Sequence, residues 1–221
     1  MSPSPTSSTA DHDSESSGSS EPLRYFGLNC TLKPSPSPSS TQALLGYITA
    51  GLEQHGATGS VERVADHDVR FGVTSDEGDG DAWPALRQKI LDADIFVLGT
   101  PIWLGHPASV SQVVMERLDA FLGETDDAGR MISYDRIAIV GVVGNEDGAH
   151  QVGAQVFQAL NDVGFTIPAS GMAYWVGEAM QKTDFLDLSP APETTLSAVD
   201  TMVRNAVHLA RRLRTAPYPP Q

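Results

Sequence analysis

Hydroxyl groups and one amino group are concentrated in residues 30–41, CTLKPSPSPSST, directly before a stretch with helical apolar spacing. The first turn of a helix offers unpaired backbone N–H groups and the positive end of the helix dipole, which together attract phosphate. The side chains expected to add donors and charge here are those of Thr31, Lys33, Ser39, Ser40 and Thr41. The segment therefore predicts a phosphate-binding loop, although Ser and Thr at a helix start are most often plain caps.

A second segment, TPIWLG at residues 100–105, places bulky apolar side chains between a proline and a glycine. It follows an uninterrupted apolar run at 95–98, which is typical of a central parallel strand that is buried on both faces. Open α/β sheets bind flat ligands at the carboxyl ends of such strands. We therefore expect a flat ligand to contact Pro101, Ile102, Trp103, Leu104 and Gly105.

A third segment, GNEDGAH at residues 144–150, follows another continuous apolar run at 136–144. Gly144 and Gly148 would let backbone N–H groups approach a ligand, and Asn145 could bond to its polar edge. The same residues are equally typical of a glycine-rich turn before a helix. Together the three segments offer a phosphate-binding loop at 30–41, an apolar surface at 100–105, here called the apolar plate, and polar groups at 144–150 that could bond to the edge of a ligand. That combination fits flavin mononucleotide (FMN) better than it fits a sugar or an amino acid.

The elements that position these segments alternate between strand and helix along the chain. We expect strands at 23–29, 60–64, 95–98 and 136–144 and a last strand within 165–175. Helices are expected at 41–54, 82–91, 109–121, 149–163 and 193–213. This alternation predicts the α/β class, as a doubly wound five-stranded parallel sheet in the order 2-1-3-4-5 with helices on both faces. The three segments follow strands one, three and four, whose carboxyl ends meet at one edge of such a sheet.

Composition limits the function classes that are open to the chain. The 221 residues carry a net charge of −14 with only three lysines, which disfavours binding to nucleic acid or to anionic membranes. No apolar run has the roughly 18–20 residues of a membrane span, and residues 1–22 lack the pattern of a signal peptide. The single cysteine, Cys30, excludes an internal disulfide framework, and no metal site is expected. We expect a cytoplasmic protein.

The domain organisation follows from the same composition. Residues 1–22 are acidic and rich in Ser and Pro, which predicts a disordered tail. Residues 23–214 form the predicted FMN-binding domain, and residues 215–221 form a short Pro-rich C-terminal tail. The polar residues 66–81 are expected to be a solvated surface loop rather than a lid over the site.

The motifs resemble those of the NADPH-dependent FMN reductases, a group of the flavodoxin-like superfamily that includes quinone and azo reductases and other NAD(P)H-dependent oxidoreductases. Thr31, Ser40 and Thr41 fall on the hydroxyl positions of that family's phosphate signature, and residues 101–105 resemble its Pro-x-aromatic-x-Gly flavin loop. The resemblance covers residues 23–180. It implies a flavodoxin-like fold, isoalloxazine contacts in residues 101–105, FMN as cofactor, NADPH or NADH as co-substrate, and a homodimer or higher homo-oligomer.

The function implied is transfer of electrons from a reduced nicotinamide through FMN to a flavin, quinone or similar small acceptor. The flavin carries this chemistry, so we expect no catalytic acid or base from the protein. His106, His150 and Tyr174 near the cleft are more typical of surface, capping or core residues.

Three other functions are open at this point. The main alternative is a flavodoxin-type electron carrier without turnover of its own substrate, and another is a domain that binds partners without a cofactor. A phosphatase that uses Cys30 as its nucleophile is disfavoured, because that chemistry needs an arginine six residues later, where Pro36 stands.

Overall fold

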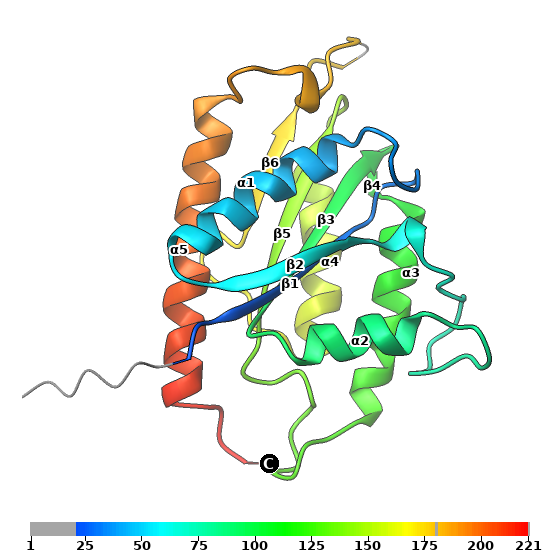
Figure 1. Cartoon of the computed structure of the whole chain (residues 1–221), viewed down its shortest axis with the longest axis vertical. Coiled ribbons are helices and arrows are strands. Elements are labelled where there is room, and N and C mark those ends of the chain that lie inside the picture. The colour runs from blue at the N-terminus through cyan, green and yellow to red at the C-terminus, as the bar shows by residue number, and fades with distance from the viewer. Residues whose placement is uncertain (1–20, 180, 221) are drawn as a thin grey trace, which may run out of the picture.

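The computed structural model describes residues 21–179 and 181–220 (Figure 1), so most of the predicted N-terminal tail lies outside the described residues. The strands are β1 (Arg24–Asn29), β2 (Thr58–Arg63), β3 (Ile95–Trp103), β4 (His106–Pro107), β5 (Ile137–Gly144) and β6 (Met172–Val176). The α-helices are α1 (Ser40–Gln54), α2 (Trp83–Leu91), α3 (Ser109–Leu118), α4 (Ala149–Asp162) and α5 (Glu193–Thr215). Three short 3-10 helices are η1 (Val64–Asp66), η2 (Asp119–Gly123) and η3 (Phe185–Asp187).

The sheet has the predicted topology. Its parallel strands run in the order β2-β1-β3-β5-β6, which is the 2-1-3-4-5 order of a doubly wound fold, and the short β4 pairs antiparallel with β3. The order reverses between β1 and β3, because β2 lies outside β1 while the later strands extend on the other side. Ligands of open α/β sheets bind at such a reversal point.

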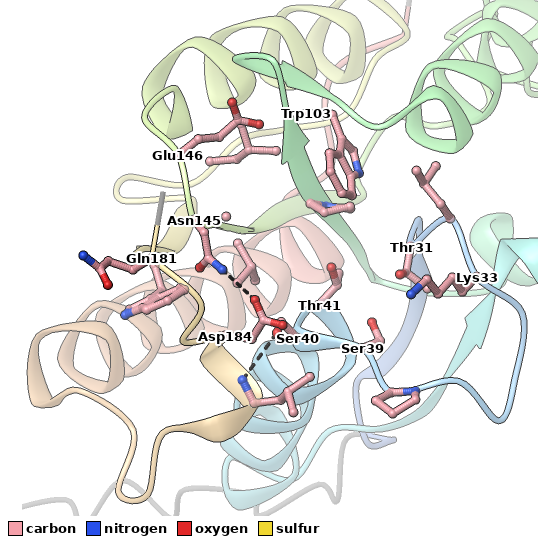
Figure 2. A pocket seen from close by; sticks show the side chains of 18 residues that line it. Thr31, Lys33, Ser39, Ser40, Thr41, Trp103, Asn145, Glu146, Gln181 and Asp184 are labelled. Atoms are coloured by element: carbon pink, nitrogen blue, oxygen red, sulfur yellow. Dashed lines mark hydrogen bonds between the residues drawn. The ribbon is translucent and has the colours of Figure 1, made fainter. Parts of the chain in front are cut away.

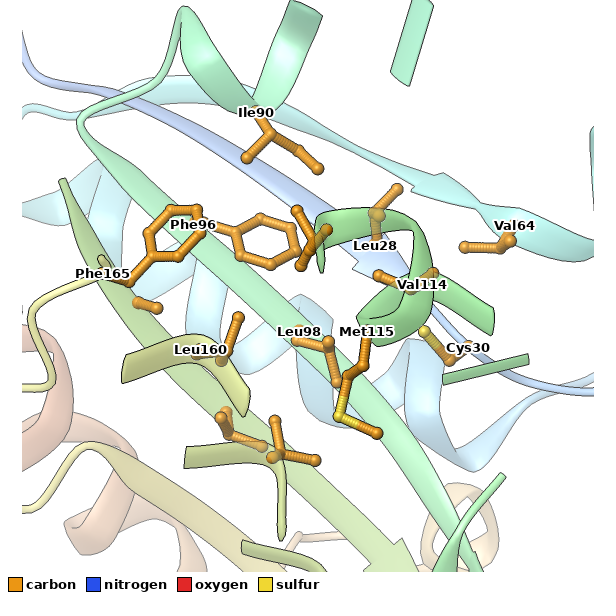
Figure 3. Close-up of a cluster of buried hydrophobic side chains, with 14 of the residues drawn as sticks. Leu28, Cys30, Val64, Ile90, Phe96, Leu98, Val114, Met115, Leu160 and Phe165 are labelled. Atoms are coloured by element: carbon orange, nitrogen blue, oxygen red, sulfur yellow. The ribbon is translucent and has the colours of Figure 1, made fainter. Parts of the chain in front are cut away.

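Helices cover both faces of the sheet, as predicted. Helices α1 and α5 pack with residues such as Val97 and Ile139 on one face. Helices α2, α3 and α4 pack on the other face around Phe96, Leu98 and Val140 (Figure 3). Side chains of adjacent residues point to opposite faces of a strand, so a strand covered on both sides must be apolar throughout.

One predicted boundary was wrong in a way that affects the site. The strand expected at 95–98 continues through Thr100 to Trp103, so most of the segment predicted as a loop is strand β3. Thr100 and Pro101 pair with Val142 and Val143 of β5, and Trp103 pairs with His106 of β4. The apolar plate is therefore attached to the sheet rather than to a free loop.

Helix α1 leads directly from the predicted phosphate loop, and its stability is open to a simple test. Gly46 lies exposed within this helix, and an added Cβ would meet no atom within 4 Å. We expect Gly46→Ala to raise the free energy of unfolding by about 0.5–1 kcal/mol in urea denaturation, because glycine loses more backbone entropy in a helix. Gly51→Ala in the same helix is the control, since its Cβ would lie 3.2 Å from Val203 Cγ2. An equal gain at both positions would contradict this reasoning.

Candidate functional site

A cavity of about 580 Å³ opens at the carboxyl ends of β1, β3 and β5, with its lining side chains shown in Figure 2. This volume falls in the range of roughly 300–1,000 Å³ that small-molecule sites occupy. The lining residues are Thr31, Leu32, Lys33, Pro38, Ser39, Ser40, Thr41, Pro101, Ile102, Trp103, Val143, Gly144, Asn145, Glu146, Trp175, Gln181, Asp184 and Leu186.

The structure brings together ten of the thirteen residues predicted to contact the cofactor. The lining includes all five from the first segment, residues 101–103 from the second, and residues 144 and 145 from the third. Leu104, Gly105 and Gly148 do not line the cavity. Contact with FMN stays a prediction for all thirteen residues.

The anion-binding end of the cavity is the start of helix α1. Ser39 is the N-cap residue, and its hydroxyl oxygen accepts a hydrogen bond of 3.1 Å from the Gln42 backbone N–H. The first N–H groups of a helix have no partner within it, and no acidic residue stands in the first turn of α1. The side chains of Lys33, Ser40 and Thr41 line the same end. This end therefore combines backbone donors, hydroxyl groups and one positive charge.

Asn29 holds the beginning of this loop, although sequence reasoning missed it. Its side chain is fully buried at the end of β1, where Nδ2 donates to Gln42 Oε1 over 2.9 Å. Its Oδ1 accepts from the Thr31 N–H over 3.0 Å. Asn29 thus ties the end of β1 both to the loop and to helix α1. The sequence signal that could have identified Asn29 is a polar residue at the end of an otherwise apolar strand.

The apolar plate is formed by the last residues of β3. Ile102 is buried, whereas the side chain of Trp103 is 54% exposed at the cavity. The next residue, Leu104, has a positive φ of 51° and is 88% exposed. Glu146 Oε1 accepts a hydrogen bond of 2.7 Å from the Leu104 N–H, which holds this turn against the loop after β5. Trp103 is therefore presented by a turn that a second loop supports.

The predicted glycines bring the two loops together. A Cβ on Gly148, which has a φ of 126°, would lie 2.8 Å from the Cα of Gly105. A Cβ on Gly144 would lie 2.8 Å from the Cβ of Ile102. Both positions need glycine because of contacts within the protein. The absence of a Cβ at these positions therefore lets the two loops pack closely, outside the cavity at Gly148 and in its wall at Gly144.

The remaining wall comes from the segment after β6, which sequence reasoning did not assign to the site. Asp184 precedes helix η3, and its Oδ1 accepts a hydrogen bond of 2.6 Å from Asn145 Nδ2 (Figure 2). The Leu186 N–H donates to Ser40 Oγ over 3.4 Å. Phe185 anchors the segment, with its ring 5.6 Å from that of Trp175. Two predicted site residues, Ser40 and Asn145, are thus also contacts of this segment.

Four residues near the predicted cleft lie outside the cavity lining. His106 Nδ1 is 3.2 Å from Gln155 Nε2, and the His150 ring packs edge-on against Tyr174 at 5.3 Å. Cys30 is fully buried in the cluster of Figure 3, and burial raises the pKa of its thiol to about 12 against an opposing contribution from Ser111. A neutral, inaccessible thiol disfavours Cys30 as a nucleophile.

The residues present fit FMN. The phosphate would meet the start of α1 with Lys33, the ring system would contact the plate at Trp103, and Asn145 stands where a polar edge would lie. No group of three or more His, Cys, Asp or Glu side chains in residues 21–179 and 181–220 is placed to hold a metal ion. The donors at the start of α1 and the apolar plate would suit a partly flat organic ligand that carries an anionic group at one end.

Comparison with known proteins agrees with this description. The sequence is 35% identical over 206 residues to 8-demethyl-8-aminoriboflavin-5'-phosphate synthase of Streptomyces davaonensis, covering 89% of this chain and 80% of that protein. The crystal structure of RosB with the bound intermediate 8-demethyl-8-formylriboflavin-5'-phosphate superposes with a TM-score of 0.82 at 34% identity. That superposition covers 89% of this chain and 82% of RosB.

A further relative is much longer than this chain. The divalent metal cation transporter MntH of Mycobacterium bovis is 36% identical over 213 residues, which are 93% of this chain but 31% of that protein. The chain thus spans less than a third of that relative's length. Among the described residues, no helix has the length and apolar character needed to cross a membrane.

The family match covers most of the domain. The model of the NADPH-dependent FMN reductases matches residues 26–181, which include most of β1, all of β2 to β6 and all three predicted cofactor segments. FMN as cofactor and a reduced nicotinamide as co-substrate follow from this match, as does the class of FMN-binding oxidoreductases. The chain belongs to the NADPH-dependent FMN reductase family.

Proposed function

We propose that this protein oxidises NADPH or NADH and passes the electrons through bound FMN to a flavin, quinone or similar small acceptor. The observation that carries the proposal is that one cavity joins an anion-binding helix start to an exposed aromatic plate. A wholly enclosed plate would suit a sealed cofactor. Trp103 is instead 54% exposed, so this side of the cavity is open to solvent.

Each part of the cavity has a distinct role in this proposal. Lys33 and the hydroxyl groups of residues 39–41 hold the phosphate, and residues 101–103 contact the ring system. Asn145 and the backbone of Gly144 bond to the polar edge of the ring. Bound FMN supplies reversible two-electron redox chemistry. The protein residues bind and orient the reactants, and the donor and the acceptor take turns in one cleft, which predicts ping-pong kinetics.

Absorption spectroscopy tests this function directly. The purified protein is mixed with FMN, free flavin is removed by gel filtration, and NADPH or NADH is added without oxygen. We expect retained flavin bands that bleach on addition of a nicotinamide and recover on addition of a quinone. Bands that neither nicotinamide changes would favour the flavodoxin-type electron carrier. Failure to bind any flavin would contradict the proposal and favour a cofactor-free binding domain.

A second candidate function is chemical modification of the flavin itself. It is favoured by the 35% identity to a synthase whose named product is a riboflavin 5'-phosphate changed at position 8. Mass spectrometry of the flavin recovered after incubation with FMN and cell extract separates the two functions. Recovery of unaltered FMN together with steady NAD(P)H oxidation would support the reductase. A flavin whose mass matches FMN with an amino group in place of one methyl group would support the synthase.

The assembly state and location stay predictions. We expect a homodimer or higher homo-oligomer in solution and residence in the cytoplasm. Light scattering coupled to gel filtration measures the first, and a monomer at the concentration used for assays would contradict it.

A further inference from the structure

The phosphate loop is supported from outside the cavity by a residue that does not line it. Arg63 is the last residue of the edge strand β2, where it is the register partner of Asn29 in β1. Its Nη1 donates to the backbone carbonyl of Lys33 over 3.1 Å and to that of Ser37 over 2.9 Å. One guanidinium nitrogen therefore joins two points of the loop that are four residues apart.

These two hydrogen bonds determine where the loop's carbonyl oxygens lie. Each carbonyl that accepts from Arg63 points towards a side chain that does not line the cavity, so its partial negative charge is directed away from a bound anion. The neighbouring side chains of Lys33, Pro38 and Ser39 do line the cavity. The two carbonyl acceptors of the loop thus face Arg63, whereas the side chains of Lys33 and Ser39 face the cavity. Such an arrangement is what phosphate recognition requires.

Asp66, in the adjoining helix η1, supports the same loop at its middle. Its two carboxylate oxygens accept from the Ser35 N–H over 2.6 Å and from the Ser35 hydroxyl over 2.7 Å. These hydrogen bonds lower the pKa of Asp66, with a smaller contribution from the positive charge of Arg63. The loop is thus held at residues 33, 35 and 37 from the end of β2, and at Thr31 by Asn29.

The rest of the Arg63 guanidinium does not account for an arginine at this position through stability. Its Nε atom is buried and has no hydrogen-bond partner among the residues that the structure describes. A buried donor without a partner costs about 1–3 kcal/mol. A shorter apolar side chain at the end of an edge strand would avoid that cost. The bonds to the two loop carbonyls are therefore the contribution that distinguishes arginine at this position.

We propose that Arg63 is a positioning residue for the flavin phosphate, and that it enables the protein to prefer FMN over riboflavin, which lacks the phosphate. This inference rests on the proposed function, since it assumes that the cavity binds a flavin. Arg63 acts through the loop rather than by touching the ligand. Its loss should therefore affect the phosphorylated flavin selectively, because the ring contacts lie on β3 and β5.

The test measures the dissociation constants of FMN and riboflavin by quenching of flavin fluorescence. For Arg63→Met we expect the constant for FMN to rise by about tenfold, while that for riboflavin stays within about twofold. Arg63→Lys keeps the charge but loses the rigid guanidinium whose Nη1 donates to both carbonyls, so its preference for FMN should fall to an intermediate value. Lys89→Met is the control: it removes the same charge from the neighbourhood of β2, where Lys89 bonds to Glu62, and should leave the preference unchanged.

The outcomes separate this inference from the proposed function. Wild-type protein that binds neither flavin would contradict the proposed function itself. Wild-type protein that prefers FMN, with an unchanged ratio of the two constants in both Arg63 variants, would overturn the role of Arg63. Equal weakening of both flavins would also overturn it, because that pattern indicates a general loss of structure. If Arg63→Met fails to fold, the ratio in Arg63→Lys decides.

Discussion

Replacing Arg117 by methionine is expected to lower the free energy of unfolding by about 3–5 kcal/mol, the usual cost of leaving a buried charge unpaired. Arg117 in helix α3 and Asp81 before helix α2 form an ion pair of 2.7 Å in which both side chains are 0% exposed. The guanidinium also donates to the backbone carbonyls of Arg70 and Thr74. Methionine would fill much of the space but would leave these acceptors and the Asp81 carboxylate without their partner.

Urea denaturation measures this loss, and the melting temperature should fall by roughly 6–20 °C for a chain of this size. The double variant Arg117→Met with Asp81→Asn separates two causes. Asparagine keeps one oxygen, which can accept from the Trp83 N–H as Asp81 Oδ1 does, and it carries no charge. We expect the double variant to be more stable than Arg117→Met alone. A double variant that is no more stable would show that lost packing, rather than an unpaired charge, dominates.

The same pair predicts how the effect depends on pH. Burial tends to raise the pKa of Asp81, but hydrogen bonds from Arg117 and from backbone N–H groups outweigh it and hold that pKa well below its usual range. A carboxylate with a lowered folded-state pKa stabilises the protein above its unfolded pKa of about 4, and this contribution is lost as pH falls further. The unfolded state is common to both proteins, so the difference between wild type and Arg117→Met should be full at pH 7. It should shrink as pH falls from the Asp81 pKa of the folded variant towards the lower Asp81 pKa of the folded wild type. A constant difference would contradict this assignment.

The ion pair of Arg117 and Asp81 is also a feature of the fold that could not be predicted from the sequence. Residues 66–81 were expected to be a solvated loop because they are polar and rich in Gly and Asp. The structure agrees that the segment lies at the surface, with Phe71 83% exposed, and that none of these residues lines the cavity. What the sequence did not indicate is the buried ion pair of Asp81 that anchors the segment. Hydrophobic periodicity places an element relative to the core. It does not reveal which distant partner a charged side chain meets, and Asp81 and Arg117 are 36 residues apart.

The fold itself was predictable because its signals are local. The apolar runs that became β3 and β5 and the alternation of strands with helices indicate a parallel sheet, and the handedness of crossovers then limits the strand order. The loops that end β1, β3 and β5 meet for the same reason. Asp184 was missed because the segment after the last strand reaches the cavity only through long-range contacts. The bond from Asn145 to Asp184 spans 39 residues.

Replacing Gly148 by alanine is expected to cost about 2–5 kcal/mol of stability and to weaken FMN binding at least about tenfold. The φ of 126° at Gly148 is unfavourable for any residue with a Cβ, and that Cβ would lie 2.8 Å from the Cα of Gly105. The atom opposite is backbone and cannot rotate away. The loop after β5 and the turn that follows Trp103 must therefore separate, which moves the aromatic plate away from the phosphate end.

Gly105→Ala is the matched control for this prediction. Gly105 has a φ of 74°, but its Cβ would meet no atom within 4 Å, so alanine there should cost only about 1–2 kcal/mol of backbone strain. Urea denaturation gives the stabilities, and fluorescence quenching gives the FMN dissociation constants. If both variants bind FMN equally well, the distance between the two loops does not control the plate. If only Gly148→Ala binds weakly, close packing of two glycines outside the cavity sets the position of Trp103 within it.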